Sequence, residues 1–479
     1  MNKATGLSKD KNEVFNPIRT DNMIQKTKQH IIINEFFHKL SLYYSSFMKR
    51  HEVAQTKRYM LTLVLGGSIS VSALAQNLKV YTLDECISEA VKNNLALRNA
   101  DNQIAMSAEQ RKEAYTKYFP TVSAMGGGFI SNKGLLQMDM GEMNMSLAKN
   151  GLAAGVTAMQ PVFAGGQIVN GNKLAKVSED AAKLQRGLSE NEVRLNAENY
   201  YWQAVMLKEK LHTLDQMDKQ LVSVESDAKA AVDAGVRNRN DLLQVQLRKN
   251  ETRTTRIQVE NNLHTVCDLL AQVMGHPNET IDVSSNANAK PEAPQQFYQS
   301  PESSLPLTNE YQLLDKQIEA NKLQYKLSVG KNLPSVAVGG GYLYNNIMDK
   351  SQNNFIGMFT VSVPISSWWG GSHDMKRQKI QLANSVLDKQ DKSEMLIIRM
   401  RKAWNDMNDA YKQVSIAQES IEQSEENLRL NTDYYQAGTA TISDLLDAQT
   451  LYQQSRDKYV ESFTNFEVKK REYLQATGR

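Results

Sequence analysis

The chain has few cysteines and few histidines, and none of the usual patterns of an enzyme. Cys86 and Cys267 are the only cysteines among 479 residues. They are compatible with two free thiols, which we favour, or with one disulfide, and spacing alone does not decide between them. The seven histidines are scattered, and no catalytic triad, metal-ligand spacing or phosphate-binding glycine loop is present. We therefore expect no enzymatic activity and no cofactor.

A basic excess is missing from most of the chain as well. The first 75 residues hold 11 lysines and arginines against 5 acidic residues, whereas the formal net charge of the whole chain is only +3. The remainder is therefore slightly acidic, and no basic face typical of nucleic-acid-binding proteins stands out. We expect no nucleic-acid partner.

Long apolar runs are also absent. Lys57 and Arg58 precede a short apolar run over 60–71, which ends in the small residues Ala73 and Ala75. This pattern predicts a secretory signal peptide over 48–75, starting at Met48, with 1–47 a mis-assigned extension or disordered tail. The run is too short to cross a bilayer as a helix, and no run of 18 apolar residues follows it. The expected mature protein is exported and has no helical anchor.

Proline is absent from two stretches of equal length. A stretch of 115 residues separates Pro161 from Pro277, and another 115 residues follow Pro364. Each stretch is rich in helix-forming residues and is interrupted by a single Ala-Gly turn. Equal runs of this kind predict an internal duplication. The repeats are expected over 80–275 and 307–478, joined by a proline-rich linker over 276–306 that we expect to lie outside the core.

The two turns share one sequence pattern. In 234–241 and in 437–447, Ala-Gly is followed by five residues and then by Asp-Leu-Leu. Gly235 and Gly438 can adopt the positive φ that ends a helix. Asn238 and Thr441 can then cap the next helix, each with an aspartate three residues later. Each turn is predicted to be the tip of a helical hairpin, whose first arm of about 60 residues would be about 90 Å long.

Each repeat also contains two strand-like segments, at 121–131 and 152–163 and at 335–344 and 355–365. In the last, apolar residues at every second position alternate with small or polar ones, which is typical of a lipid-facing barrel strand. The same alternation also fits a sheet packed on a soluble core. Trp368 and Trp369, just after the last strand, match the aromatic girdle of a membrane barrel.

Four strands are too few to close a membrane barrel, since the smallest have about eight. An open sheet edge is not tolerated in lipid, because its N–H and C=O groups find no water there. Several copies must therefore combine. Two copies would give eight strands with a filled lumen, and three would give twelve strands with a passage. The long helices would then bury their apolar stripes against one another as coiled coils.

Several motifs over 80–478, taken in their order along the chain, resemble those of the TolC family of outer-membrane efflux proteins. The motifs are Leu83-Asp84-Glu85-Cys86-Ile87 with Asn93-Asn94, Phe119-Pro120-Thr121-Val122, the segment Gln160-Pro161-Val162-Phe163-Ala164-Gly165-Gly166, and the two tips. The resemblance implies a homotrimer in which a twelve-strand membrane β-barrel in the outer membrane continues into a periplasmic tunnel of long α-helical coiled coils.

The function implied by the resemblance is that of the outer-membrane channel component of a tripartite efflux or type I secretion system. Such a channel is a passive exit duct for small molecules or proteins. Its implied partners are outer-membrane lipid, a periplasmic adaptor (membrane fusion) protein and an inner-membrane RND or ABC transporter. A protein of another class, a periplasmic coiled-coil scaffold without a pore, is the alternative. The sequence does not identify the cargo.

Members of the family close their tunnel at the helix tips, and the resemblance places the constricting carboxylates at Asp444 and Asp447. Residues three apart share a helix face, so three copies would present a ring of six carboxylates, which binds and selects cations. Asp444 also suits the role of a helix cap. The locking contacts of the family fall on Tyr435 and Asp241.

The locking arginine of the family falls on Ala440 in this chain. Arg237 and Arg239, in the first tip, are the candidates to replace it. The resemblance also implies that the adaptor docks on the tips, at Gly235, Gly438, Leu242 and Leu445.

Four methionines lie close together in the loop between the first two strands. Met138, Met140, Met143 and Met145 supply thioethers that could hold a soft ion such as Cu(I). Methionines also fill loops without binding metal, and we favour that interpretation. A chelator-sensitive Cu(I) titration distinguishes the two.

Overall fold

The computed structural model describes residues 79–132, 136–140, 143–147, 150–285, 291–347 and 350–479, and the structural statements below concern these residues. The predicted signal peptide over 48–75 and the predicted extension over 1–47 lie outside the described residues. No described helix combines the length and the apolar character needed to cross a membrane.

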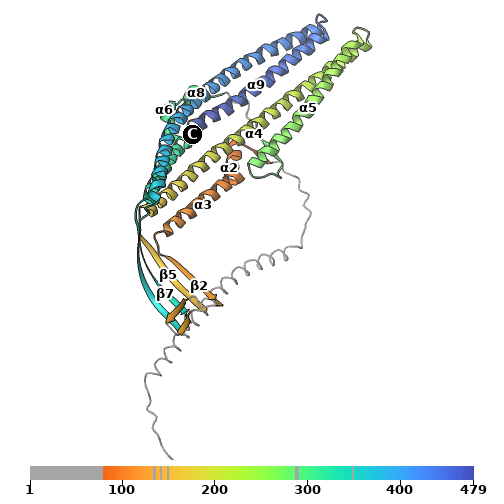
Figure 1. Cartoon of the computed structure of the whole chain (residues 1–479). Coiled ribbons are helices and arrows are strands. Elements are labelled where there is room, and N and C mark those ends of the chain that lie inside the picture. The colour runs from red at the N-terminus through yellow and green to blue at the C-terminus, as the bar shows by residue number, and fades with distance from the viewer. Residues whose placement is uncertain (1–78, 133–135, 141–142, 148–149, 286–290, 348–349) are drawn as a thin grey trace, which may run out of the picture. The chain divides into compact units, whose positions relative to one another are not determined.

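Two helix pairs of matching length dominate the described chain (Figure 1). Helix α4 (Gln167–Asp233) has 67 residues and α5 (Arg239–Val273) has 35. In the second repeat, α8 (Ser367–Gln436) has 70 residues and α9 (Ile442–Ala476) has 35. The longer arms are about 100 Å long at 1.5 Å per residue. The near-equal lengths confirm the predicted duplication.

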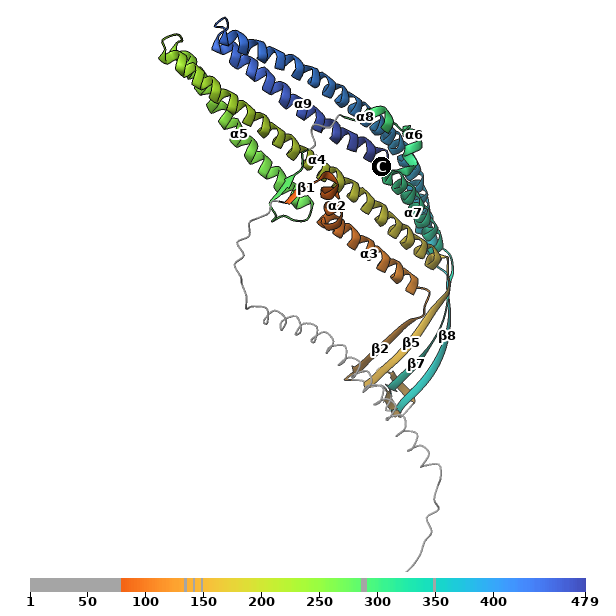
Figure 2. The ribbon, with the colours of Figure 1, turned by 180° about the vertical axis from the view of Figure 1, so that it is seen from behind.

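A shorter helical segment precedes the strands in each repeat. It is α7 (Asn309–Lys331) in the second repeat, but it is divided into α2 (Leu83–Asn93) and α3 (Leu95–Thr116) in the first. Figure 2 shows α2 and α3 along α4. The apolar residues that recur three and four positions apart from Leu83 through Tyr115 predict one continuous helix there. The break occurs at Asn94, which is extended and whose side chain accepts a hydrogen bond from Ala96 N and donates one to Val273 O, each at 2.8 Å.

One antiparallel sheet contains the four long strands, as predicted. The strands are β2 (Thr121–Ile130), β5 (Asn150–Ala164), β7 (Ser335–Ile347) and β8 (Lys350–Ser362), in the order β2-β5-β7-β8. The pair β5–β7 therefore joins the two repeats. In the described chain, β2 and β8 each have one strand neighbour in this sheet, so their outer edges are free to pair with other copies.

The register of the sheet places the expected apolar side chains on one face. Val338 lies opposite Phe359 and Tyr342 opposite Phe355. Strand β8 starts and ends earlier than the predicted 355–365. Its end at Ser362 is explained by Pro364, which has no N–H for the ladder and restricts the residue before it.

The proline-rich linker differs from its expected role. Within it, β6 (Ile281–Val283) pairs in parallel with β1 (Lys79–Tyr81). Ile281 and Val283 are 4% and 0% exposed and belong to a core formed with α2, α4 and α5. The expectation that this segment lies outside the core was therefore wrong. The high proline and polar content obscured a three-residue strand, whose burial depends on contacts distant in sequence.

The buried apolar residues form three separate cores along the helices. The first core surrounds Trp202, whose ring meets Phe463 edge-on at 5.8 Å. A second core lies between α8 and α9 around Met400, Met407 and Phe466. A third core lies at the hairpin tips. Each core buries the apolar stripe of one stretch of helix, as expected for long packed helices.

Candidate functional site

Both hairpin tips are built by the same backbone motif. Gly235 and Gly438 have φ of 73° and 77°, in the left-handed region that glycine tolerates. At the first tip Val236 N donates to Ala231 O at 2.9 Å, and at the second Thr439 N donates to Tyr434 O at 2.9 Å. These bonds satisfy carbonyls at the helix end, as in a Schellman motif. The predicted turns are therefore present at both positions.

The helix that follows the second tip begins with a capping box. Asp444 N donates to Thr441 Oγ1 at 3.2 Å, while Thr441 N and its hydroxyl donate to Asp444 Oδ2 at 2.9 and 2.6 Å. The hydrogen bond from the Thr441 hydroxyl, and to a smaller extent the one from the Thr441 backbone N–H, lowers the pKa of Asp444 below its usual value. The first tip differs, because Asn238 accepts a bond from Asn240 N and Asp241 has no reciprocal bond to the cap.

The two predicted gate carboxylates are exposed near the start of α9. Asp444 uses one oxygen in its cap, and Asp447, one turn further on, is exposed as well. Within the described chain neither carboxylate forms an ion pair with Lys, Arg or His. Their charge is therefore not neutralised by their own protomer. The second tip can present two negative charges to whatever lies beyond it.

Arg237 connects the two hairpins. Its guanidinium carbon lies 4.7 Å from the centre of the Tyr435 ring, and its Nη2 donates to Tyr435 O at 3.3 Å. Its Nη1 also lies 4.0 Å from Asp241 Oδ2. Arg239, by contrast, is exposed and forms no ion pair within the described chain. Of the two arginines considered as substitutes for the missing one, the structure brings only Arg237 to Tyr435 and Asp241.

The tip core holds the hairpins together beneath these polar contacts. Ile442 and Leu445 are 2% exposed and pack with Leu221 and Val245, and Leu242 lies at the edge of this core. Leu445 was expected to contact the adaptor, but its side chain is buried in this core and does not face a partner. Val236 is 76% exposed at the turn and was missed, because its neighbours in sequence do not indicate which tip residue points outward.

A groove of about 610 Å³ separates the two tips. The first hairpin contributes Ala231, Val236 and Arg237 to its wall, and the second contributes Tyr435 and Gly438, among others. The groove is apolar at Val236 and charged at Asp227 and Arg237. Arg237 and Tyr435, which contact each other, both line it.

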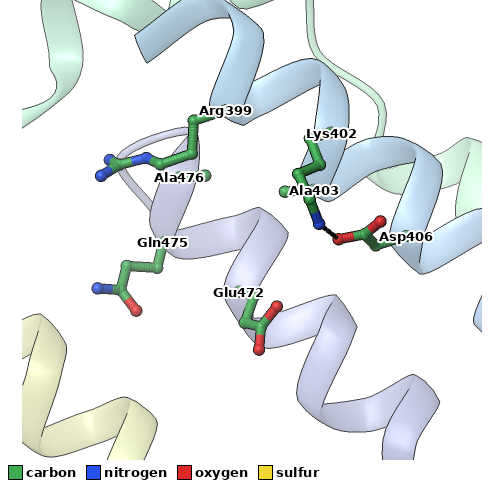
Figure 3. A pocket seen from close by; sticks show the side chains of 7 residues that line it. All are labelled: Arg399, Lys402, Ala403, Asp406, Glu472, Gln475 and Ala476. Carbon is green, nitrogen blue, oxygen red and sulfur yellow. Dashed lines mark hydrogen bonds and ion pairs between the residues drawn. The ribbon is translucent and has the colours of Figure 1, made fainter. Parts of the chain in front are cut away.

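A smaller hollow of about 230 Å³ lies further along the molecule between α8 and α9 (Figure 3). Its charged side chains are paired with neighbours. Lys402 contacts Asp406, as the dashed line shows, Arg399 donates to Glu310 at 2.7 Å and Lys469 to Glu472 at 2.7 Å. With its charges satisfied internally, this hollow has the properties of a seam between helices and not of a ligand site.

Cys86 and Cys267 are free and buried in the first core. Burial raises the pKa of Cys86 to about 12 and that of Cys267 to about 11. Both thiols therefore stay protonated and weakly reactive at neutral pH.

The methionine loop contains a short hairpin of β3 (Leu136–Met140) and β4 (Met143–Leu147), in which Met138 lies opposite Met145 and Met140 opposite Met143. The side chains of this hairpin are outside the described part of the structure, so the Cu(I) hypothesis stays untested. Among the residues that are described, no cluster of three or more His, Cys, Asp or Glu residues could hold a metal ion.

Comparisons with known proteins agree with the duplication. A family model described as outer membrane efflux protein matches residues 86–276 and 312–472, one segment in each repeat. No curated protein sequence matches the chain significantly.

Several solved structures share the fold. The chain is similar to CusC (TM-score 0.72, 16% identity, covering 84% of this chain and 93% of that one). It is also similar to VceC of Vibrio cholerae (TM-score 0.71, 12% identity, 83% and 96%) and to the CmeC channel of Campylobacter jejuni (TM-score 0.69, 14% identity, 83% and 85%). At these identities the solved structures establish the fold alone.

Proposed function

Since the chain belongs to the outer membrane efflux protein family, it is a non-enzymatic efflux channel of the outer membrane with a periplasmic helical extension, and we propose that the two hairpin tips are its gate. The observation that carries this proposal is the contact of Arg237 with Tyr435 and Asp241, beside two unpaired carboxylates on α9. Channels of the family form trimers in tripartite pumps, and the free edges of β2 and β8 are consistent with a sheet closed by two further copies.

Asp444 and Asp447 supply the electrostatic part of the gate. In three copies around a common axis they form a ring of six carboxylates. Such a ring concentrates cations and repels anions in a narrow passage. The lowered pKa of Asp444 keeps its charge in place when the pH falls moderately.

Arg237 supplies the mechanical part of the gate. It bridges the α4–α5 tip and the α8–α9 tip of one protomer through the ring and carbonyl of Tyr435. Opening requires the two tips to separate, so these contacts must be broken. Asp241 orients the guanidinium from the side of the first hairpin.

The adaptor docks on the tips in this proposal. Gly235 and Gly438 form the exposed turns, and Val236 provides an apolar contact on the wall of the groove. Leu242 and Leu445 support this surface from beneath. An adaptor that enters the groove would displace Arg237 and so link docking to opening. An inner-membrane transporter of the RND or ABC class supplies the energy, and the methionine hairpin is not required.

The test is ion selectivity in planar bilayers. Asp444→Asn with Asp447→Asn removes both charges while an amide at residue 444 can still accept the cap hydrogen bonds of Thr441. We expect higher conductance and a lower ratio of cation to anion permeability. Asp233→Ala, at the end of α4 in the other tip, is the matched control and should leave selectivity unchanged. If the double variant keeps the wild-type selectivity, these carboxylates do not line the constriction.

A further inference from the structure

The sheet and the helices that adjoin it differ sharply in charge. Strands β2, β5 and β7 contain no charged residue, and Lys350 is the single one in β8. Exposed aromatic side chains follow at the helix side of the sheet. Tyr118 and Phe119 precede β2, and Trp368 and Trp369 follow β8, with exposures between 41% and 75%. This order of an uncharged sheet and then aromatic side chains marks the edge of the hydrocarbon layer.

Beyond the aromatic side chains lies a set of exposed basic residues that we call the basic belt. They fall on four helical segments or directly beside them, all within 12 residues of the helix end nearest the sheet: Arg111, Lys112, Lys117, Lys173, Lys176, Lys322, Lys326, Lys331, Lys376, Arg377 and Lys379. The same stretches contain five acidic residues, Glu109, Glu113, Glu179, Glu319 and Asp374, so basic residues outnumber acidic ones about two to one. The belt was not visible in the sequence, because its members come from four separate segments of a slightly acidic chain.

Most of the belt has no ion-pair partner. In the described chain Arg111 pairs with Glu179, Lys112 with Glu109 and Arg377 with Asp374, whereas the eight other members, all lysines, form no ion pair. Twelve residues of helix are about 18 Å long. The headgroup layer of a bilayer is about 5–8 Å thick on each side, and lysine side chains extend toward it. The members nearest the sheet therefore lie at headgroup depth.

The densest part of the belt surrounds a groove between α3 and α4. The groove has a volume of about 670 Å³, and Arg111, Lys112, Lys173 and Lys176 line it. Tyr115, Tyr118 and Val169 form its apolar wall on the side toward the sheet.

The far end of the groove is closed by a satisfied carboxylate. Lys183 donates to Glu179 Oε1 at 2.6 Å and Arg111 to Glu179 Oε2 at 3.0 Å, and these bonds lower the pKa of Glu179. An anion in the groove would meet Lys173 and Lys176, which line it and form no ion pair among the described residues.

We propose that this groove binds the phosphate headgroup of an anionic glycerophospholipid from the leaflet that faces the helices. Lys173 and Lys176 contact the phosphate, and the first carbons of the acyl chains follow Tyr115, Tyr118 and Val169 toward the bilayer. Basic side chains near a membrane surface attract anionic lipids in this way. The proposal rests on the placement of the sheet in the outer membrane and is independent of the gate.

A lipid fits the groove better than a soluble anionic cargo. The groove pairs its charges with an apolar wall that continues into an uncharged sheet, which matches the charged headgroup and acyl chains of a lipid. Bound lipid would also fix the height of the channel in the membrane, since the belt lies on all four helical segments that join the sheet.

The test measures lipid binding to the purified full-length assembly in zwitterionic detergent. Phosphatidylglycerol and phosphatidylcholine with the same fluorescent acyl chain are titrated at low salt. Lys173→Gln with Lys176→Gln should weaken phosphatidylglycerol binding about 25-fold, since each surface lysine contributes about fivefold. Lys219→Gln with Lys229→Gln is the matched control. These two exposed lysines lie on the same helix far from the sheet and form no ion pair in the described chain, so binding should change less than twofold.

Four outcomes would overturn the proposal. The first is that wild-type protein binds both lipids equally, and the second is that the control variant loses as much affinity as the groove variant. The third is that inorganic phosphate displaces the lipid as well as unlabelled phosphatidylglycerol does, which would identify a free-anion site. The fourth is that the groove variant changes ion selectivity in planar bilayers and leaves lipid binding intact, which would place the belt inside the conduit. None of these results bears on the selectivity of the variants at Asp444 and Asp447, so the two proposals fail separately.

Discussion

Replacing Arg237 with alanine tests the link between the two hairpins most directly. The substitution removes the stacking on the Tyr435 ring, the hydrogen bond to Tyr435 O and the long ion pair with Asp241. The tip core of Leu221, Val245 and Leu445 lies beneath and is left intact. The fold should therefore survive while the hairpins separate more easily.

The size of the effect follows from the three contacts. Stacking of a partly exposed cation on an aromatic ring contributes about 0.5–1 kcal/mol. A charged donor at 3.3 Å from a carbonyl contributes about 1 kcal/mol, since the bond is long and only partly buried. The ion pair at 4.0 Å contributes a few tenths of a kcal/mol at most. The total of about 2 kcal/mol corresponds to a roughly thirtyfold shift toward separated tips in each protomer.

Single-channel recording in planar bilayers measures this shift as open probability. Arg239→Ala removes the same charge from the same tip, but Arg239 is exposed and unpaired in the described chain, so it should leave open probability within about twofold of wild type. Arg237→Lys keeps the charge without the planar guanidinium and should fall between the two. The reasoning is refuted if both alanine variants open equally, because the effect would then come from tip charge and not from the contacts of Arg237.

Two further predictions concern stability. Burial raises the pKa of Asp457 to about 6, above the value near 4 expected when unfolded, and its Oδ1 has no hydrogen-bond partner. A carboxyl group whose pKa is higher in the folded than in the unfolded state does not lower the free energy of unfolding below pH 4, where it is protonated in both states. It destabilises the fold as the pH rises through 6. Asp457→Asn should thus raise Tm by a few degrees at pH 7.5 and not at pH 4, with the exposed Asp388→Asn as an unresponsive control; equal gains at both pH values would contradict this. Gly330→Ala would bring a Cβ within 2.5 Å of Gly165 O at the junction of helix and sheet, and should cost about 1–3 kcal/mol in a thermal melt. Gly171→Ala, with open space around it, should be neutral or stabilising, and a harmless Gly330→Ala would mean that the junction relaxes freely.

The sequence by itself determined the duplicated architecture. Proline removes a backbone donor and restricts φ, so two equal proline-free runs defined the long helices. Gly235 and Gly438, with Thr441 three residues before Asp444, defined the tips through backbone chemistry confined to a few neighbouring residues. Alternating side chains defined the strands, because the period of two is a local property.

Only the tertiary structure decided which of several similar residues take part in a contact. Arg237 and Arg239 are equivalent in sequence, yet one meets Tyr435 from a hairpin 198 positions away and the other does not. For the same reason Leu445, which was expected to face the adaptor, is 2% exposed, whereas Val236, which was not among the expected docking residues, is 76% exposed.

The break at Asn94, the buried strand over 281–283 and the basic belt also depend on segments distant in the chain. Local signals determine where a helix or strand starts and ends. The long-range packing of one element against another determines which side chains are buried, paired or free.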